Sequence, residues 1–209
     1  LRKDSFTLEN YAKLFQSSSA YKPYLVSIVY SILAALIVAV ICIAVARIVT
    51  KLKHKWDKLY EPFILIPWLL PSTMIALGLM MTYDEARLNL ANKILVATPV
   101  ILLVAYIVIK IPFSYRMTRA AFISLDGNME EAAQVMGAKP FYTMRKMILP
   151  VIMPVVISVI VLNFNSLLSE YDLSVFLYHP LFQPLGIVIK MATDETATTE
   201  AQAMAFVYT

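Results

Sequence analysis

Long uncharged stretches alternate with short charged ones along this chain, and the pattern predicts membrane-spanning helices. Three uncharged runs, of 24, 22 and 23 residues, each exceed the roughly 20 residues that cross a hydrocarbon core. A charge near the bilayer centre costs about 2.5 to 3.5 kcal/mol, so a spanning helix is largely free of charges. A fourth stretch holds one charge, Lys110, near enough to its end to reach the interface. We expect four spans, at about residues 24–46, 62–83, 94–112 and 147–169.

Two further apolar stretches do not fit a spanning helix. The run over residues 173–189 contains His179, Pro180, Pro184 and Gly186, which would leave backbone groups unpaired in lipid, so a loop or a re-entrant segment is expected. The last apolar run starts at about residue 201 and is too short to cross. We expect it to be the truncated start of a closing span, in a fragment of a longer polypeptide. The fold class is therefore all-α, a polytopic membrane helical bundle forming a single domain over residues 1–209.

The composition supports a membrane protein and excludes several soluble classes. Hydrophobic residues make up 60% of the chain and charged residues 15%, with a mean hydropathy of +0.71, whereas soluble chains carry about 25% charged residues. The single cysteine, Cys42, excludes a disulfide scaffold, and two histidines are too few for a Cys/His zinc cluster. Four residues after the fourth span could offer oxygen and nitrogen ligands to a metal ion: Tyr171, Asp172, Tyr178 and His179. Their spacing matches no metal motif, so an ordinary outer loop is favoured.

Lysine and arginine are concentrated on one side of the predicted spans. The loops after the first and third spans carry five each, and the two loops on the other side carry three together. The positive-inside rule therefore places the first set in the cytoplasm. Four more cations before the first span weaken this contrast, and an upstream span could hold that stretch outside. The charged residues within 170–200 are five acidic residues and one lysine, so this segment is expected at the outer face.

The basic run over residues 51–58 includes Trp56 and has two interpretations, nucleic acid binding or contact with anionic lipid. Because the run directly follows a span, lipid contact and membrane topology explain it better. We therefore expect the lipid bilayer as a partner and no nucleic acid.

The loop over about residues 124–148 has the signals of a short helix, a tight turn and a second helix. Asp126 or Asn128 can cap the first helix, and Glu131 stands three residues after Asn128 as in a capping box. Gly137 suits a left-handed stop, and Pro140 suits the first turn of the next helix. The adjacent alanines that follow Glu131 would let another protein approach the helix backbone closely.

The same loop contains the residues of a known motif. Glu131-Ala132-Ala133, then Gly137, then Leu149-Pro150 resemble the EAA loop of the permease subunits of binding-protein-dependent (type I) ABC importers. The pattern differs at Met147, where the family has isoleucine. The resemblance extends over roughly residues 6–209 and lacks the family's closing span. Further residues fit the family: Pro67, Pro71, Pro112, Arg116, Arg119 and the triplet Ser169-Glu170-Tyr171.

The resemblance implies the type I ABC importer permease fold in a bacterial inner membrane, with the EAA loop cytoplasmic. Such permeases form the pathway as homodimers or with a similar second permease, receive cargo from an extracytoplasmic substrate-binding protein, and dock on cytoplasmic ATPase subunits. The coupling residues would be Glu130, Glu131, Ala132, Ala133, Gly137, Leu149 and Pro150.

The sequence contains no phosphate-binding motif with which the chain itself could hydrolyse ATP to drive transport. Its four glycines are never arranged as GxxxxGK, so it has no loop of that kind for phosphates. We therefore expect no enzyme activity and no bound cofactor or metal. ATP and Mg would belong to the partner ATPase subunit.

Polar and small residues recur at helical spacing in two of the predicted spans. Asn163, Ser166 and Glu170 fall at i, i+3 and i+7 and could line a pathway, although Glu170 could instead sit at the interface and pair locally. Small residues recur every four positions in the first span, which favours close helix packing over cargo contact: Ser27, Ser31, Ala35 and Ala39. Prolines in the second and fourth spans can act as hinges or as packing kinks.

The most similar cargo class is ferric iron, because residues 169–180, SEYDLSVFLYHP, look most like those of iron permeases. Phosphonates, thiamine and polyamines stay open. Two alternatives lie outside this class. In an ion-gradient-driven secondary transporter Glu170 would be a proton site, but the paired intramembrane charges and inverted repeats of such proteins are missing. In a non-transporting membrane scaffold, the loop would only recruit a partner.

Overall fold

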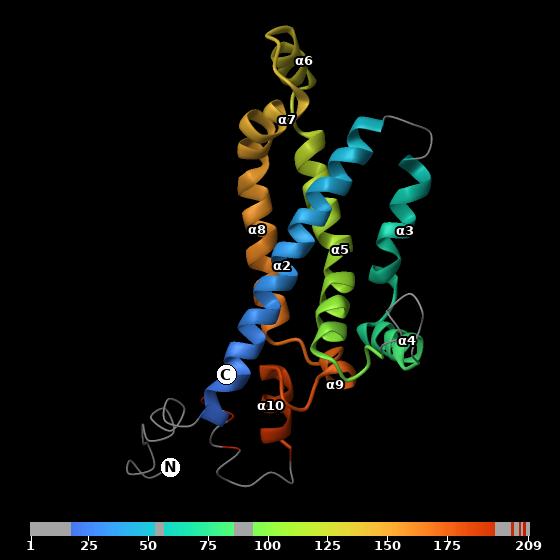
Figure 1. Ribbon diagram of the computed structural model, residues 1–209, viewed down its shortest axis with the longest axis vertical. Coiled ribbons are helices and arrows are strands. Elements are labelled where there is room, and N and C mark those ends of the chain that lie inside the picture. Colours follow the sequence, from blue (N-terminus) through green and yellow to red (C-terminus); the bar gives the residue numbers. More distant parts are fainter. Residues whose placement is uncertain are drawn as a thin grey trace. The chain divides into compact units, whose positions relative to one another are not determined.

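The computed structural model describes residues 18–52, 57–85 and 94–194, with positions 202, 205 and 207 (Figure 1). The predicted N-terminal stretch and most of the predicted closing span lie outside these residues. The described part is helical, and its isolated bridge between His179 and Phe182 belongs to no strand. The helices are α2 (Ser18–Leu52), α3 (Asp57–Leu69), α4 (Ser72–Tyr83), α5 (Pro99–Ile123), α6 (Gly127–Val135), α7 (Pro140–Thr143), the π-helix η3 (Met144–Ile148), α8 (Leu149–Leu168), α9 (Ser174–Leu177) and α10 (Leu185–Ala192). The all-α prediction is confirmed.

Three continuous helical stretches in the described part are long and apolar enough to cross a membrane. They are Ala20–Lys51, Pro99–Ile123 and Pro140–Leu168. The stretch predicted as the second span is interrupted at Leu70 and Pro71, between α3 and α4, and it adds a fourth span if the two helices are counted together. The four-span arrangement therefore stays a prediction.

The third predicted span starts later and ends later than expected. Helix α5 begins at Pro99, because a proline at the first helical position needs no N–H partner and has a suitable φ. Residues before it form turns, in which the Thr98 amide donates to the Leu95 carbonyl at 3.1 Å. The helix then continues through Pro112 to Ile123.

Contacts divide the chain into two compact units. Unit 1 contains residues 1–32, 72–106 and 165–209, and unit 2 contains residues 33–71 and 107–164. The boundaries fall inside α2, α5 and α8 and at the break between α3 and α4.

Unit 2 has an apolar core built by α2, α5, η3 and α8. Small residues on α2 allow the close approach of larger side chains from the other helices. The buried core consists of Val38, Ala39, Cys42, Ala46, Tyr115, Ala121, Phe122, Ile148, Ile152 and Val156. Helix α3 is joined to α5 by an ion pair between Arg119 and Glu61 at 2.5 Å, and the guanidinium of Arg116 stacks over Trp68.

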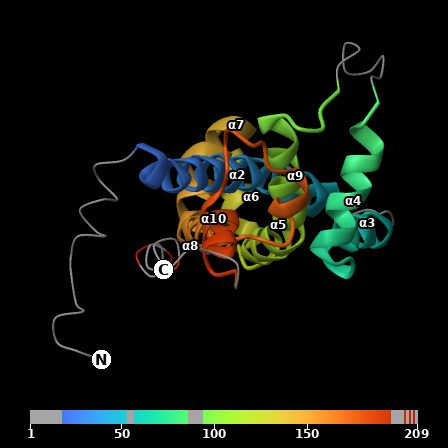
Figure 2. The same cartoon turned by 90° about the horizontal axis from the view of Figure 1, so that it is seen from below.

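Unit 1 is held by buried hydrogen bonds as well as apolar contacts. The Ser27 hydroxyl on α2 accepts the amide of Leu185 at 2.7 Å. The hydroxyls of Tyr106 on α5 and Ser174 on α9 are 2.6 Å apart, and α4 packs beside α9 (Figure 2). Ser27 and Ser31 are buried in this unit, and Ala35 and Ala39 are buried in unit 2, which confirms the packing interpretation for the small residues of the first span.

The segment over residues 173–189, expected as a loop or re-entrant piece, contains α9 and the start of α10. The sequence does not predict helix α10, because prolines usually interrupt a helix, whereas Pro184 is the N-cap and lies just outside α10. Leu185, Gly186 and Ile187 are buried. A Cβ on Gly186 would lie 3.1 Å from the carbonyl oxygen of Glu170 and 3.2 Å from that of Ser169.

We expect Gly186→Ala to destabilise the protein, because its methyl group would lie 3.1 and 3.2 Å from two backbone carbonyl oxygens, closer than an ordinary van der Waals contact. Overpacking of this kind typically costs about 1 to 3 kcal/mol. The measurement is the thermal unfolding midpoint of the purified protein in detergent. Gly78→Ala is the matched control, since a Cβ there meets nothing within 4 Å and glycine within a helix is unfavourable. Equal midpoints for the two variants would contradict this account of Gly186.

Candidate functional site

Helix α6 begins at a side-chain cap. The carboxylate of Asp126 accepts the amide of Asn128 at 3.0 Å, and the helix starts at Gly127. Of the two predicted caps, the structure therefore selects Asp126. The capping box predicted between Asn128 and Glu131 is wrong, because Asn128 already lies inside the first turn of the helix.

The end of α6 is a Schellman motif around Gly137. The Gly137 amide donates to the Gln134 carbonyl and the Ala138 amide to the Ala133 carbonyl, both at 2.9 Å. Gly137 has φ +79°, a left-handed conformation that other residues rarely adopt. The predicted left-handed stop is confirmed. Pro140 is the first residue of α7, as predicted.

The chain enters α8 through the π-helical turn Met144–Ile148. Pro150 has no N–H to donate to the carbonyl of Lys146, so the regular α-helical ladder is interrupted there. Leu149 is half-buried and Pro150 is exposed at the start of α8. The Leu-Pro pair of the predicted motif thus marks the point where the loop becomes a long apolar helix.

The motif residues of α6 face in different directions. Ala133 is completely buried, Glu131 and Ala132 are exposed, and Glu130 is half-buried. Ala133, Gly137 and Met147 line one cavity of about 440 Å³ beside Tyr142. The alanine, the glycine and the residue at the family's isoleucine position therefore meet around the same turn, which gives their spacing a structural reason.

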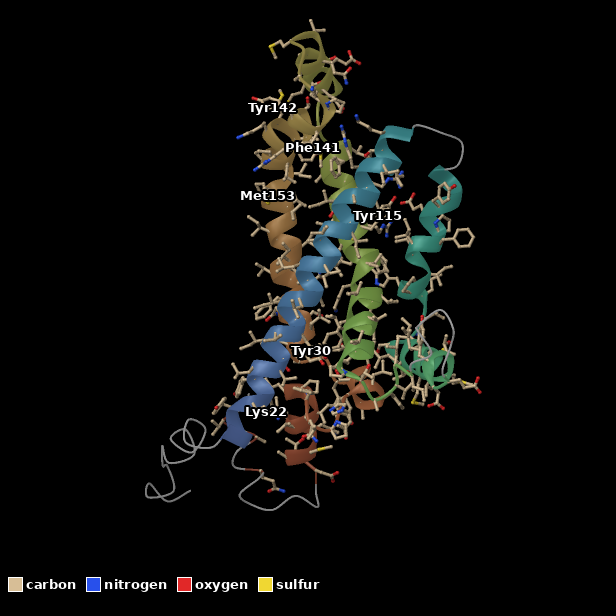
Figure 3. All side chains as sticks on the ribbon, in the orientation of Figure 1. Lys22, Tyr30, Tyr115, Phe141, Tyr142 and Met153 are labelled. Carbon is tan, nitrogen blue, oxygen red and sulfur yellow. The ribbon has the colours of Figure 1, made fainter. Side chains whose placement is uncertain are left out.

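Four large apolar side chains around the turn are strongly exposed. Val135 is 89%, Met136 76%, Phe141 77% and Tyr142 57% exposed. We call these four residues the apolar patch; Figure 3 labels Phe141 and Tyr142 on α7. Helix α6 lies beyond the ends of α5 and α8 (Figure 1). The patch is not among the features predicted from the sequence, although apolar residues inside a charged loop are a signal for such a surface.

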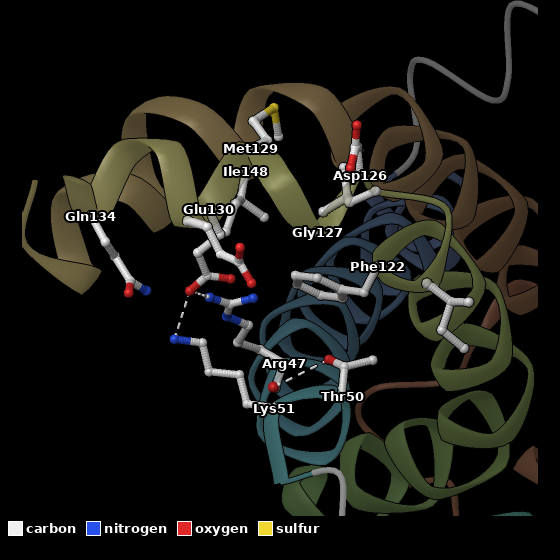
Figure 4. A pocket seen from close by; sticks show the side chains of 13 residues that line it. Arg47, Thr50, Lys51, Phe122, Asp126, Gly127, Met129, Glu130, Gln134 and Ile148 are labelled. Carbon is white, nitrogen blue, oxygen red and sulfur yellow. Dashed lines mark hydrogen bonds and ion pairs between the residues drawn. The ribbon is translucent and has the colours of Figure 1, made fainter. Parts of the chain in front are cut away.

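Glu130 contacts two cations of α2. Its Oε1 lies 2.6 Å from Arg47 Nη2 and 2.7 Å from Lys51 Nζ, and all three side chains border a cavity of about 550 Å³ (Figure 4). Burial acts to raise the pKa of Glu130, but the hydrogen bonds and charges of the two cations outweigh it, so this pKa lies below its ordinary value. Because this pKa is lowered in the folded protein, the ion pairs of Glu130 stabilise the fold fully at pH values above the ordinary glutamate pKa of about 4.3. This stabilisation is lost as the pH falls through the lowered pKa.

The predicted pathway residues do not form one helical stripe. Helix α8 ends at Leu168, so Glu170 lies beyond it and the i+7 relation fails. Asn163 is buried and its Nδ2 donates to the Ser114 hydroxyl at 2.7 Å, joining α8 to α5 within unit 2. Oε1 of Glu170 accepts the Leu173 amide at 3.4 Å. Local pairing of this kind is the alternative to pathway lining that the sequence leaves open for Glu170. Pathway lining by Asn163, Ser166 and Glu170 stays a prediction, and Ser166 is the exposed member of the three.

His179, one of the possible ligands after the fourth span, belongs to a tight turn. Its Nδ1 accepts the Leu181 amide at 3.1 Å, and its ring packs against Phe182. Among the residues that the structure describes, no three histidine, cysteine, aspartate or glutamate side chains are grouped as metal ligands.

Residues 43–209 match the family described as "Binding-protein-dependent transport system inner membrane component". This chain belongs to that family. The resemblance drawn from the EAA loop is confirmed, and so is a multi-pass inner-membrane location.

Two curated relatives and a solved structure agree with the family. The chain is 32% identical over 185 residues to "Probable ABC transporter permease protein y4fN" of Sinorhizobium fredii, covering 88% of this chain and 32% of that protein. It is 22% identical to "Putative 2-aminoethylphosphonate transport system permease protein PhnV" of Salmonella paratyphi A, covering 97% and 74%. A bacterial alginate ABC transporter in complex with its alginate-bound periplasmic protein matches with a TM-score of 0.79 and 19% identity, covering 99% and 81%, and shows the fold. The chain thus spans about a third of the first relative and about three quarters of the second.

Proposed function

We propose that this chain forms half of the translocation pathway of an ATP-driven importer and that α6 and α7 dock on a cytoplasmic ATPase subunit. The observation that carries the proposal is the apolar patch, four large side chains exposed around one turn. Apolar clusters of this kind on a polar loop mark contact surfaces for other proteins. The cap at Asp126 and the Schellman motif at Gly137 fix the backbone that bears the patch.

The remaining partners of the proposed importer are supported by the family and by the similar solved structure. No GxxxxGK loop is present in the sequence, so ATP and Mg would be bound by the ATPase subunit. A second permease, identical or similar, would complete the pathway. A substrate-binding protein would deliver the cargo at the outer face, which is supported by the similar alginate ABC transporter, solved in complex with an alginate pentasaccharide-bound periplasmic protein. The basic loops, including α6, would then face the cytoplasm.

The cargo is a small solute that a binding protein can carry. The relative PhnV is named for 2-aminoethylphosphonate, which supports the phosphonate alternative, and neither curated relative described above is named for iron. Ferric iron stays a candidate on the residues SEYDLSVFLYHP alone. Thiamine and polyamines stay candidates on the same resemblance.

The secondary-transporter alternative depends on Glu170 as a proton site. That carboxylate accepts a backbone amide from Leu173, and its own carbonyl accepts the Ser174 hydroxyl at 2.8 Å. Both contacts are local turn interactions. These contacts give Glu170 a role in the local turn, which supports the importer proposal over a transporter that cycles protons through this residue.

Reconstitution of the full-length protein tests the proposal. Proteoliposomes would contain the permease with the ATPase encoded beside it, and the neighbouring binding protein would be added outside. The probes are labelled 2-aminoethylphosphonate, ferric iron, thiamine and spermidine. We expect uptake of one probe that requires both ATP and the binding protein. Uptake driven by a proton gradient without ATP would overturn the proposal in favour of a secondary transporter, and an absence of uptake for every probe together with no ATPase binding would favour a scaffold.

A further inference from the structure

Helix α6 has few attachments to the long helices. Ala133 is its buried residue, and the two ends are fixed by the turns at Asp126 and Gly137. A further attachment is Glu130, whose carboxylate lies within 2.7 Å of both Arg47 and Lys51 on α2. A helix with so little buried apolar surface depends on these polar contacts for its position relative to α2.

The geometry of the contact is specific. Arg47 and Lys51 are four residues apart on α2, so they lie on one face of the helix and both reach the same carboxylate oxygen. The Arg47 side chain is 18% exposed and that of Glu130 22%, so water screens this pair less than an open surface pair. The guanidinium of Arg47 also lies over the ring of Phe122 on α5, 6.0 Å from its centroid. Arg47 thus links α2, α5 and α6 at one point.

Glu130 and its neighbour Glu131 have different surroundings. Glu131 is exposed, whereas Glu130 is turned toward α2 and ion-paired within its own chain (Figure 4). A residue whose charge is already neutralised inside the chain is poorly suited to bind a partner. Glu130 is instead well suited to hold α6, the helix that is proposed to bind the ATPase.

We propose that Glu130 is a positioning residue that fastens α6 to the end of α2, so that α2 follows α6 when the ATPase moves it. This inference rests on the proposed function, because it assigns α6 the force that the ATPase delivers. The carboxylate transmits that force through charge-assisted hydrogen bonds, which resist both separation and rotation better than apolar contact would.

The test is a spin-label distance measurement on the full-length protein, in nanodiscs. Labels are placed through Ile48→Cys on α2 and Asn128→Cys on α6, both at exposed positions, in a Cys42→Ser background. Distances are recorded for the chain alone, and for the complex with the ATPase before and after trapping with ATP and vanadate. We expect one narrow distribution in all three states.

Glu130→Gln should broaden this distribution. The fraction of molecules in which α6 is separated from α2 should rise about tenfold, the factor expected when about one charge-assisted hydrogen bond is lost. The double variant Glu130→Lys with Arg47→Glu restores opposite charges at the contact and should restore the narrow distribution. Glu85→Gln, which removes an exposed carboxylate elsewhere, is the charge control and should change nothing. A merely structural need for glutamate at position 130 would not be rescued by the exchanged pair.

Two results would overturn the inference: a Glu130→Gln distribution as narrow as that of the parent, or a nucleotide-dependent shift between the labels in the parent itself. Failure of the proposed function looks different. In that case the ATPase does not bind, while the distance in the chain alone still reports whether Glu130 fastens α6.

Discussion

A Gly137→Val variant should be inserted into the membrane normally and should lose nearly all ATP-driven uptake. At φ +79° a side chain costs roughly 1 to 2 kcal/mol, and more for a β-branched residue, so the Schellman turn would open. The turn sets the direction in which α7 leaves α6 and therefore the relative position of the two halves of the apolar patch. Membrane fractionation measures insertion, and uptake in a strain that depends on this permease measures transport.

Two control variants separate conformation from bulk. A Cβ meets nothing within 4 Å at either Gly137 or Gly127, but only Gly137 of the two has positive φ. Gly127→Ala should therefore transport normally. Gly137→Asn should retain part of the activity, because asparagine tolerates the left-handed conformation better than other residues. Normal uptake by Gly137→Val would show that the turn has no part in coupling.

The turn also shows what the sequence could predict. Gly137 and Pro140 act through backbone conformations that their side chains impose or permit, so their roles were readable from position alone. The cap was harder to assign, because Asp126 and Asn128 are both good caps and stand two residues apart. Only the start of the helix at Gly127 decides between them.

The contacts that join distant segments were beyond the sequence. Glu130 pairs with Arg47, 83 positions away along the chain, and Asn163 pairs with Ser114 at a separation of 49. Helical periodicity places Asn163 on a face of α8 but does not say whether that face meets another helix, lipid or a pathway. From the sequence alone, a polar residue in a span is a pathway candidate. In the structure, the polar side chain of Asn163 joins two helices.

Charging the apolar patch should have the second large effect, the loss of the ATPase from the complex. Each substitution can be chosen so that the local helix favours it. Met136→Lys places a cation at the C-terminal end of α6, and Phe141→Asp places an anion in the first turn of α7, where helix dipoles stabilise such charges by about 0.3 to 1 kcal/mol. Folding of the loop should therefore survive both changes.

Binding of the ATPase should be lost when both substitutions, Met136→Lys and Phe141→Asp, are present. Apolar side chains at the centre of an interface often contribute 2 kcal/mol or more, so the double variant should weaken ATPase binding by at least about 100-fold, enough to abolish co-purification. Met136→Leu is the matched control, because it keeps an apolar side chain of similar volume and should keep the ATPase bound. If the Met136→Lys, Phe141→Asp protein still recovered the ATPase in full, the apolar patch would not be the docking surface. The exposed Glu131 and Ala132 on α6 would then be the next residues to test as the docking surface, since they belong to the same motif and lie outside the patch.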